Sequence, residues 1–284
     1  MQIAQGSSGD PLWRGRSKGT ILRGSGTARS DRASFNSERL GSMKAIAFAL
    51  FALCFCQPAQ ADTINAREVV SRLFAAAPDQ PPDLSGLDLA NLDLAGVDFK
   101  RAKLKGTSLF GTDLSGANLS GCDMSGAVLD RAILTNTNFT DATLTEASIR
   151  RPSIFLAMVP AASEAAIFRG ANLERAWLEG QFDFIDFTGA KLAGARFGGL
   201  NPRDNQGLIT GAVLRGAKFA RAIMTEAVLE RADLSFADFS GAQLDRANLR
   251  NANLTKATFD GASLREADLS GTAQDDSQPA QGGG

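Results

Sequence analysis

Large apolar residues recur at every fifth position along two long stretches of the chain. One stretch runs without a break from Leu84 to Val159, and the other runs from Ile209 to Leu269. Helices repeat near 3.6 residues and strands near 2, so neither element alone explains a period of five. Two residues before each large residue the side chain is usually small, and from Ala212 to Ala267 it is always alanine. The pattern therefore indicates two inward positions in every five residues, one large and one small.

A longer period of twenty residues predicts the geometry of the fold. Phe219, Phe239 and Phe259 are spaced by twenty, and Phe99 and Phe139 are spaced by forty. Twenty residues are four units, so four pentapeptides in each square turn would place these rings one above another. Stacked turns with strand-like spacing lie about 4.8 Å apart, which allows neighbouring turns to form hydrogen bonds. The sequence therefore predicts an all-β solenoid stabilised by contacts between successive turns.

The units resemble those of the pentapeptide repeat family, whose pattern is A-(D/N)-L-x-x. The matching units are ANLSG (117–121), ADLSF (232–236), ANLRN (247–251) and ANLTK (252–256). The resemblance covers residues 82–271. It implies that this segment forms a right-handed quadrilateral parallel β-helix.

The register of the repeat changes in the middle of the chain. Val159–Phe168 and Leu178–Phe187 each span nine residues instead of ten, and Phe197–Phe219 spans 22 instead of 20. We interpret these as two single-residue deletions and a two-residue insertion, with a small bulge at 198–207. With this register, about nine to ten turns follow. One stacked column would consist of Phe99, Leu119, Phe139, Val159, Leu178, Phe197, Phe219, Phe239 and Phe259.

The two ends of the solenoid differ in sequence. An open turn exposes apolar side chains and unpaired backbone groups, so it needs protection. In the segment 62–81, Val69, Val70, Leu73 and Phe74 have helical spacing, which predicts an N-terminal capping helix and a linker. Residues 272–284 are polar and rich in glycine, and we expect a disordered tail. A homodimer formed through the uncovered last turn is an alternative way to protect the C-terminal end of the solenoid.

The N-terminal region has the pattern of an exported protein. Residues 1–42 are interpreted as disordered or as a wrongly assigned upstream extension. Residues 43–61 contain Lys44, twelve apolar residues and an Ala-Gln-Ala triplet, which together are typical of a secretory signal peptide. Twelve apolar residues are too few to span a bilayer, so we expect no stable membrane insertion. The alternative interpretation of the twelve apolar residues is a buried helix. A mature protein starting near Asp62 would be periplasmic or secreted.

The composition argues against catalysis. The chain contains no histidine and no tyrosine, which removes the commonest general base and metal ligand. Cys122 could be a nucleophile, but it occupies a small inward position and is better explained as buried filler. Asp residues such as Asp88 and Asp113 directly precede central apolar residues, so they should face water. We expect no enzyme activity, no cofactor and no metal site.

Charge and surface residues leave protein binding as the expected function. Removing residues 1–61, which hold eight basic and three acidic residues, leaves 22 basic and 28 acidic residues and a net charge of −6. This charge is too small to dictate a partner. Two groups of outward residues are candidates for a protein contact, although local packing and a solvated basic stripe are the alternatives. They are the apolar group Phe155, Leu156, Met158 and Trp177, and the basic group Arg131, Arg150, Arg151 and Arg169.

Two functions compete on this basis. The first is an exported, non-catalytic binding or scaffold protein with an unidentified protein partner. The second comes from the family resemblance and is a cytosolic DNA mimic that inhibits a type II topoisomerase. The second needs a cytosolic chain with a densely acidic surface, whereas this sequence has an export signal and arginines on many turns. We therefore favour the first function and expect no nucleic acid partner.

Overall fold

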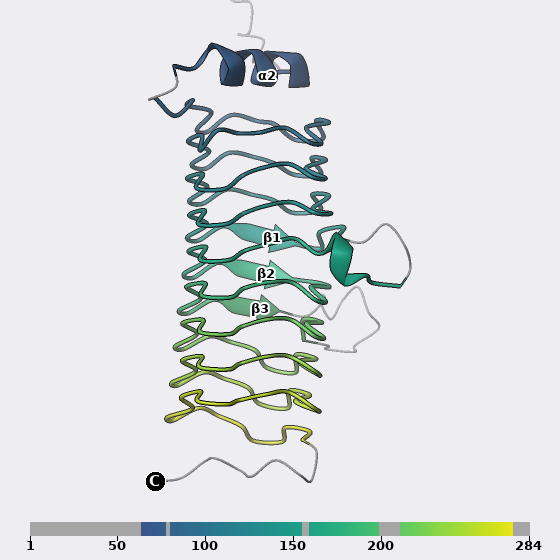
Figure 1. The fold of residues 1–284 in the computed structure, drawn as a ribbon, viewed down its shortest axis with the longest axis vertical. Coiled ribbons are helices and arrows are strands. Elements are labelled where there is room, and N and C mark those ends of the chain that lie inside the picture. Colours follow the sequence, from purple (N-terminus) through teal and green to yellow (C-terminus); the bar gives the residue numbers. More distant parts are fainter. Residues whose placement is uncertain (1–63, 78–79, 155–158, 199–210, 275–284) are drawn as a thin grey trace, which may run out of the picture. The chain divides into compact units, whose positions relative to one another are not determined.

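A computed structural model of the chain describes residues 64–77, 80–154, 159–198 and 211–274. All of them lie in one compact unit, Gln60–Gly284. Figure 1 shows that this unit is a stack of similar turns preceded by one helix. The predicted upstream extension 1–42 and signal peptide 43–61 lie outside the described residues.

The helix before the first turn is α2, Ala66–Ala75 (Figure 1). The side chain of Asn65 caps its N-terminus by accepting a hydrogen bond of 3.0 Å from the Glu68 backbone N–H. Val69 and Leu73 are buried and belong to the same core cluster as the inward residues of the coil. Within the described part of the chain, no helix is long and apolar enough to cross a membrane.

Four columns of parallel backbone bridges run along the coil, one for each pentapeptide of a turn. In one column Asp98 pairs with Asn118, and Asn118 pairs with Asn138, at the predicted spacing of twenty. Another column widens at mid-length into a parallel sheet in the order β1–β2–β3. Its strands are β1 (Ser148–Arg150), β2 (Trp177–Glu179) and β3 (Arg196–Gly198). The fold is therefore of the β-helix type, mostly strand with little helix.

The large inward residues fill the interior of the coil as stacked columns. The rings of Phe219 and Phe239 are 5.0 Å apart and within 5° of parallel, and those of Phe239 and Phe259 are 4.9 Å apart. The stacking predicted for these three rings is confirmed. The small inward alanines are likewise buried from Ala212 to Ala257.

Threonine replaces alanine at some small inward positions without leaving a polar group unsatisfied. The hydroxyl groups of Thr107, Thr112 and Thr137 are buried, and each donates a hydrogen bond to a backbone carbonyl 23 residues earlier in the chain. Burying a hydroxyl is tolerated when it finds such a partner. The small inward position is therefore limited mainly by side-chain volume, and it can hold a short polar side chain.

The outward Asp and Asn residues stabilise the turns. Asp88, Asp93 and Asp98 each accept a hydrogen bond from the backbone N–H two residues further on. Asn118 repeats this contact and also donates its amide to Asp98 in the preceding turn at 3.2 Å. Such short side chains favour turns because they replace a backbone acceptor. Their abundance is thus explained by folding.

The predicted register is wrong between Ile154 and Phe168. Val159 is 76% exposed, and the ring of Phe139 stacks instead on Phe168 with a centroid separation of 4.5 Å. Ile154 and Phe168 lie on successive faces although they are 14 residues apart, so nine residues are inserted here. The short helix η2, Ala162–Glu164, lies in this insertion. Val159 fits the period of five only by coincidence.

The predicted register is also wrong between Phe197 and Phe219. Leu178 and Phe182 are four residues apart on successive faces, so the predicted deletion before Phe187 is confirmed. Phe197, however, meets Phe219 edge-on at 87°, because it belongs to the column of Leu178. Among the described residues the next large inward side chain is Leu214, 17 positions later, and the predicted bulge at 198–207 falls almost wholly outside the described residues. The true phenylalanine column is Phe99, Leu119, Phe139, Phe168, Phe187, Phe219, Phe239 and Phe259.

The coil also continues slightly beyond its predicted end at residue 271. Ala273 forms a parallel bridge with Asn253, and its N–H donates to the Ala252 carbonyl at 3.0 Å. The predicted start of the tail at residue 272 is therefore too early, because a small residue such as Ala273 is enough to continue the ladder of backbone bridges. Residues 275–284 lie outside the described residues.

Candidate binding surface

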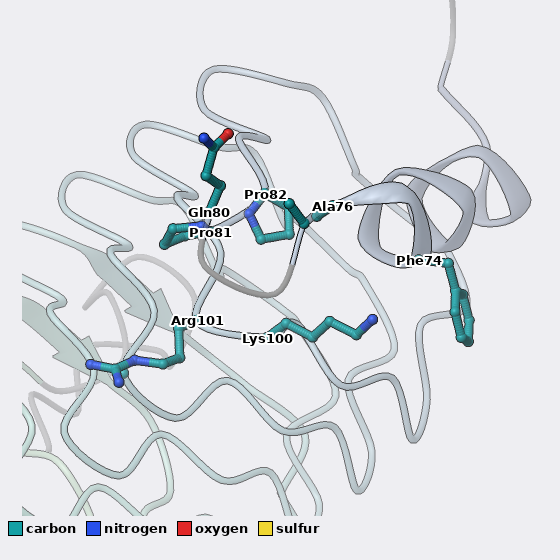
Figure 2. A pocket seen from close by; sticks show the side chains of 9 residues that line it. Phe74, Ala76, Gln80, Pro81, Pro82, Lys100 and Arg101 are labelled. Atoms are coloured by element: carbon teal, nitrogen blue, oxygen red, sulfur yellow. The ribbon is translucent and has the colours of Figure 1, made fainter.

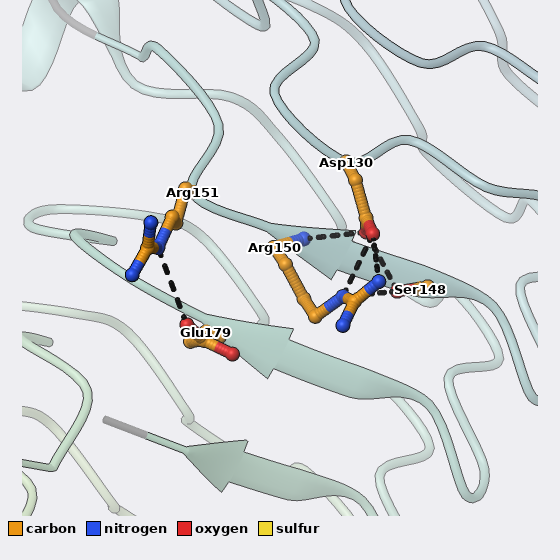
Figure 3. A network of polar contacts seen from close by, with 5 residues as sticks. All are labelled: Asp130, Ser148, Arg150, Arg151 and Glu179. Carbon is orange, nitrogen blue, oxygen red and sulfur yellow. Dashed lines mark hydrogen bonds and ion pairs between the residues drawn. The ribbon is translucent and has the colours of Figure 1, made fainter. Parts of the chain in front are cut away.

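The outward side of β1, β2 and β3 carries part of the group of aromatic and charged residues that the sequence singled out. We call this surface the β1–β3 face. It contains Arg150 from β1, Trp177 and Glu179 from β2, and two residues from adjacent positions, Asp130 and Arg151. Figure 3 shows the polar contacts among four of these residues and Ser148.

Trp177 lies on the β1–β3 face with 44% of its surface exposed. The guanidinium carbon of Arg150 is 5.1 Å from the centre of the indole ring, which is a cation–π distance. The indole nitrogen lies over Gly198 in β3, only 3.2 Å from the place where a Cβ would stand. The ring therefore spans neighbouring turns, and the missing side chain at Gly198 gives it room.

Arg150 is held in place by the buried carboxylate of Asp130 (Figure 3). Its Nε donates to Asp130 Oδ2 at 2.7 Å, and its backbone N–H donates to Oδ1 at 3.0 Å. The Ser148 hydroxyl donates to the same Oδ1 at 2.6 Å. The hydrogen bond with Asp130 raises the pKa of Arg150 above its ordinary value, so the guanidinium stays charged beside Trp177.

Two further arginines lie near this network. Arg151 forms an ion pair with buried Glu179, with 3.4 Å between Nε and Oε1. Arg131, one turn earlier, has its guanidinium carbon 5.9 Å from the ring centre of exposed Phe110. Arg150 and Arg151 are therefore each paired with a carboxylate on the β1–β3 face.

The structure separates Arg169 from the other predicted site residues. Arg169 follows Phe168, whose column lies two units beyond that of Ile149 in a four-unit turn, so it lies on the opposite face. Its guanidinium pairs there with Asp186. The prediction that Arg169 belongs to one basic group with Arg131, Arg150 and Arg151 is wrong, because it depended on the incorrect register after Ile154. Phe155, Leu156 and Met158 lie outside the described residues.

Sequence reasoning missed the carboxylates that organise this surface. Asp130 and Glu179 are both less than 10% exposed, although outward acidic residues were expected to be solvated. A signal did exist for Asp130: it precedes Arg150 by twenty residues, which places the two one above the other in adjacent turns. Glu179 had no such signal, because the insertion after Ile154 hides its spacing from Arg151.

The described residues offer little for catalysis. Cys122 is buried, and burial raises the pKa of its thiol to about 12, so the reactive thiolate is scarce at neutral pH. In the described ranges no group of three or more His, Cys, Asp or Glu side chains could hold a metal ion.

A cavity of about 690 Å³ lies where α2 joins the coil (Figure 2). Lys100 extends toward Phe74, and Arg101 points away from it (Figure 2). The Lys100 ammonium donates to the Leu73 carbonyl at 3.0 Å and lies 4.8 Å from the Phe74 ring centre. Lys100 is thus occupied in holding the C-terminus of α2, which is a structural role.

The repeats on both sides of the two insertions match the sequence model of pentapeptide repeats. The matched residues are 83–116, 112–151, 209–244 and 242–273, with eight copies in all. The chain belongs to the pentapeptide repeat family. The unmatched middle, residues 152–208, is the part of this pentapeptide repeat protein where the coil is interrupted, and it contains β2 and β3. No curated protein is similar enough in sequence to match.

Solved structures of other pentapeptide repeat proteins resemble this one in part. HetL from the cyanobacterium Nostoc is 25% identical, over 76% of this chain and 99% of HetL, with a TM-score of 0.32. The fluoroquinolone resistance protein QnrB1 is 21% identical, over 66% of this chain and 94% of its own, with a TM-score of 0.32. A protein from the Arabidopsis thaliana thylakoid lumen is 26% identical, over 44% and 70%, with a TM-score of 0.24.

Proposed function

We propose that this pentapeptide repeat protein is an exported, non-catalytic binding or scaffold protein that contacts a protein partner through the β1–β3 face. The observation that carries the proposal is Trp177, an exposed indole fixed by a charged arginine that is itself fixed by a buried carboxylate. Trp and Arg are over-represented among the residues that dominate binding energy.

The rigidity of the surface supports the same proposal. Arg150 loses little rotamer freedom on binding when Asp130 already holds its guanidinium, and preorganised groups bind more tightly. Folding of the coil does not require an indole at this position, because equivalent outward positions in other turns carry Ser108, Ser148 and Asn248. A topoisomerase-binding DNA mimic is less favoured, because carboxylates on this face are neutralised by arginines.

The partner proposal is tested by Trp177→Ser with Phe236→Ser as the matched control. Phe236 is also an exposed aromatic, but it lies on another face. A partner captured from an envelope extract should be purified and its affinity measured by calorimetry. We expect Trp177→Ser to weaken binding at least tenfold and Phe236→Ser to leave it unchanged. Equal binding by Trp177→Ser and the original chain would contradict the proposal.

Export follows from the signal-peptide pattern of residues 43–61, and we propose a periplasmic or secreted location. Cleavage after the Ala-Gln-Ala triplet would remove the apolar segment and leave Asp62 as the first residue. N-terminal sequencing of the protein from a secretion-competent host should therefore start at Asp62. A cytosolic product that retains residues 1–61 would exclude export and favour the topoisomerase alternative.

We also propose that α2 is the N-terminal cap of the coil. Leu84 in the first turn is fully buried, whereas Leu264 and Leu269 in the last turn are only partly buried. Val69→Asp should place an unpaired carboxylate in the apolar interface, which costs several kcal/mol. Thermal unfolding should therefore begin at a lower temperature, while the control Ser71→Asp, at an exposed position of the same helix, should change it little. If both variants melt alike, α2 does not protect the first turn.

The partly buried last turn leaves a homodimer as the second partner proposal. Joining two last turns would cover Phe259, Leu264 and Leu269 from both copies. Light scattering over a range of concentrations should then show a dimer that dissociates on dilution, whereas a monomer at every concentration would contradict it.

A further inference from the structure

A second surface feature lies on the side of the coil opposite the β1–β3 face. A cavity of about 220 Å³ occurs where the nine-residue insertion rejoins the coil. We call it the corner cavity. The insertion is fixed at this point, because the Asn136 N–H donates to the Glu164 carbonyl at the end of η2 at 2.8 Å. Asn136 and Ser163 are among the polar residues lining the cavity.

Two cations and one carboxylate line the corner cavity. Ile167, Asp186 and Lys218 occupy three successive rungs of one column, and Arg169 reaches from the first rung to the second. Its Nε is 2.6 Å from Asp186 Oδ2. The charges of Arg169, Asp186 and Lys218 sum to +1, so the cavity has one positive charge in excess.

Asp186 orients Arg169 and leaves its terminal amino groups available. The backbone N–H of Thr188 donates to Asp186 Oδ1 at 3.0 Å. Burial opposes ionisation, but hydrogen bonds from Thr188 and Arg169 hold the pKa of Asp186 below its ordinary value, so it remains charged. Among the described residues, the side chain of Arg169 forms a hydrogen bond only through Nε, and Lys218 forms no ion pair. Both cations can therefore bind an additional anion.

One wall of the corner cavity is aromatic. The ring of Phe184 lies over Gly216, where a Cβ would stand 2.8 Å from the ring. Phe184 occupies a corner position with φ of 57°, and the other described non-glycine residues at positive φ are polar or charged except Phe236. An aromatic side chain is rare in this conformation. Its use here provides an apolar surface beside the two cations.

We propose that the corner cavity binds a small organic carboxylate, with its oxygens held by Arg169 and Lys218 and its apolar portion against Phe184. Arginine forms charge-assisted hydrogen bonds with carboxylates through its planar amino groups. The volume suits a ligand the size of a single substituted ring, since cavities for drug-sized ligands are larger, roughly 300–1,000 Å³.

The test is calorimetric titration of the purified full chain with benzoate, benzamide and acetate. Benzoate should bind saturably at one site. Benzamide has the same shape without the charge, and acetate has the charge without the ring, so each should bind at least tenfold more weakly. Added salt should weaken benzoate binding. Absence of saturable benzoate binding, or equal binding of benzoate and benzamide, would overturn the proposal.

Variants locate the binding to the cavity. Arg169→Gln, Lys218→Gln and Phe184→Asn should each weaken benzoate binding at least tenfold. Arg246→Gln is the matched control, because Arg246 also pairs with a carboxylate, that of Glu226, on another face. If Arg169→Gln lowers thermal stability, Lys218→Gln remains informative because it breaks no ion pair. Benzoate binding that survives both Arg169→Gln and Lys218→Gln would overturn the assignment.

Discussion

Replacing Phe219 with alanine should lower the free energy of unfolding by about 4 kcal/mol. Phe219 is fully buried and lies between two parallel rings, 5.3 Å from Phe187 and 5.0 Å from Phe239. Its truncation removes contacts to both adjacent turns and leaves a cavity that the close stacking of the backbone prevents from collapsing. Urea titration followed by circular dichroism measures the change.

The control for this prediction is Phe236→Ala. Phe236 is 60% exposed and contacts Lys256 through a cation–π interaction, so its truncation should cost less than about 1 kcal/mol. If the two variants were destabilised equally, inward stacking would not be the source of stability.

Replacing Arg215 with alanine should destabilise the protein by about 3 kcal/mol at neutral pH. Arg215 is the partner of Asp183, a fully buried carboxylate, with Nε 2.7 Å from Oδ1 and Nη2 3.3 Å from Oδ2. Removing the guanidinium leaves a negative charge in the protein without a partner.

Arg246→Ala distinguishes a buried pair from an exposed one. Arg246 lies 2.8 Å from Glu226, but both side chains are about 60% exposed, so the expected loss is below about 1 kcal/mol. In addition, replacing Asp183 with leucine in the Arg215→Ala background should recover part of the stability, because no charge is then left buried. Failure to recover would mean that Arg215 stabilises the fold by packing.

The coil could be predicted because its inward positions repeat at a fixed spacing. From Leu84 to Ile154 the spacing of five and twenty identifies each inward residue, and the bridges agree with it. The prediction was wrong where Val159 continued the apolar period inside an insertion. A surface insertion adds little closure entropy and need not disturb the turns around it, so the pattern of the coil does not reveal it.

The candidate surface was predicted only in part. An exposed Trp177 followed from its place before the inward Leu178, but its contact with Arg150 was not specified by the sequence. The burial of Asp130 could not be read from its own pentapeptide, because it depends on Arg150 and Ser148 in the next turn. The opposite placement of Arg169 followed from the insertion, whose length sequence reasoning misjudged.

The unequal burial of the two ends gives the coil a direction of disassembly. Each interior turn has neighbours on both sides, but the last turn packs against only one turn among the described residues, and its Leu264 and Leu269 remain partly exposed. Fraying should therefore start there and proceed turn by turn toward α2, as a zipper opens from its free end. A partner bound to the β1–β3 face would stabilise the turns in the middle of the coil against this unfolding. Under a pulling force, the turns after Gly211 would unfold while those around β1 and β2 remained folded.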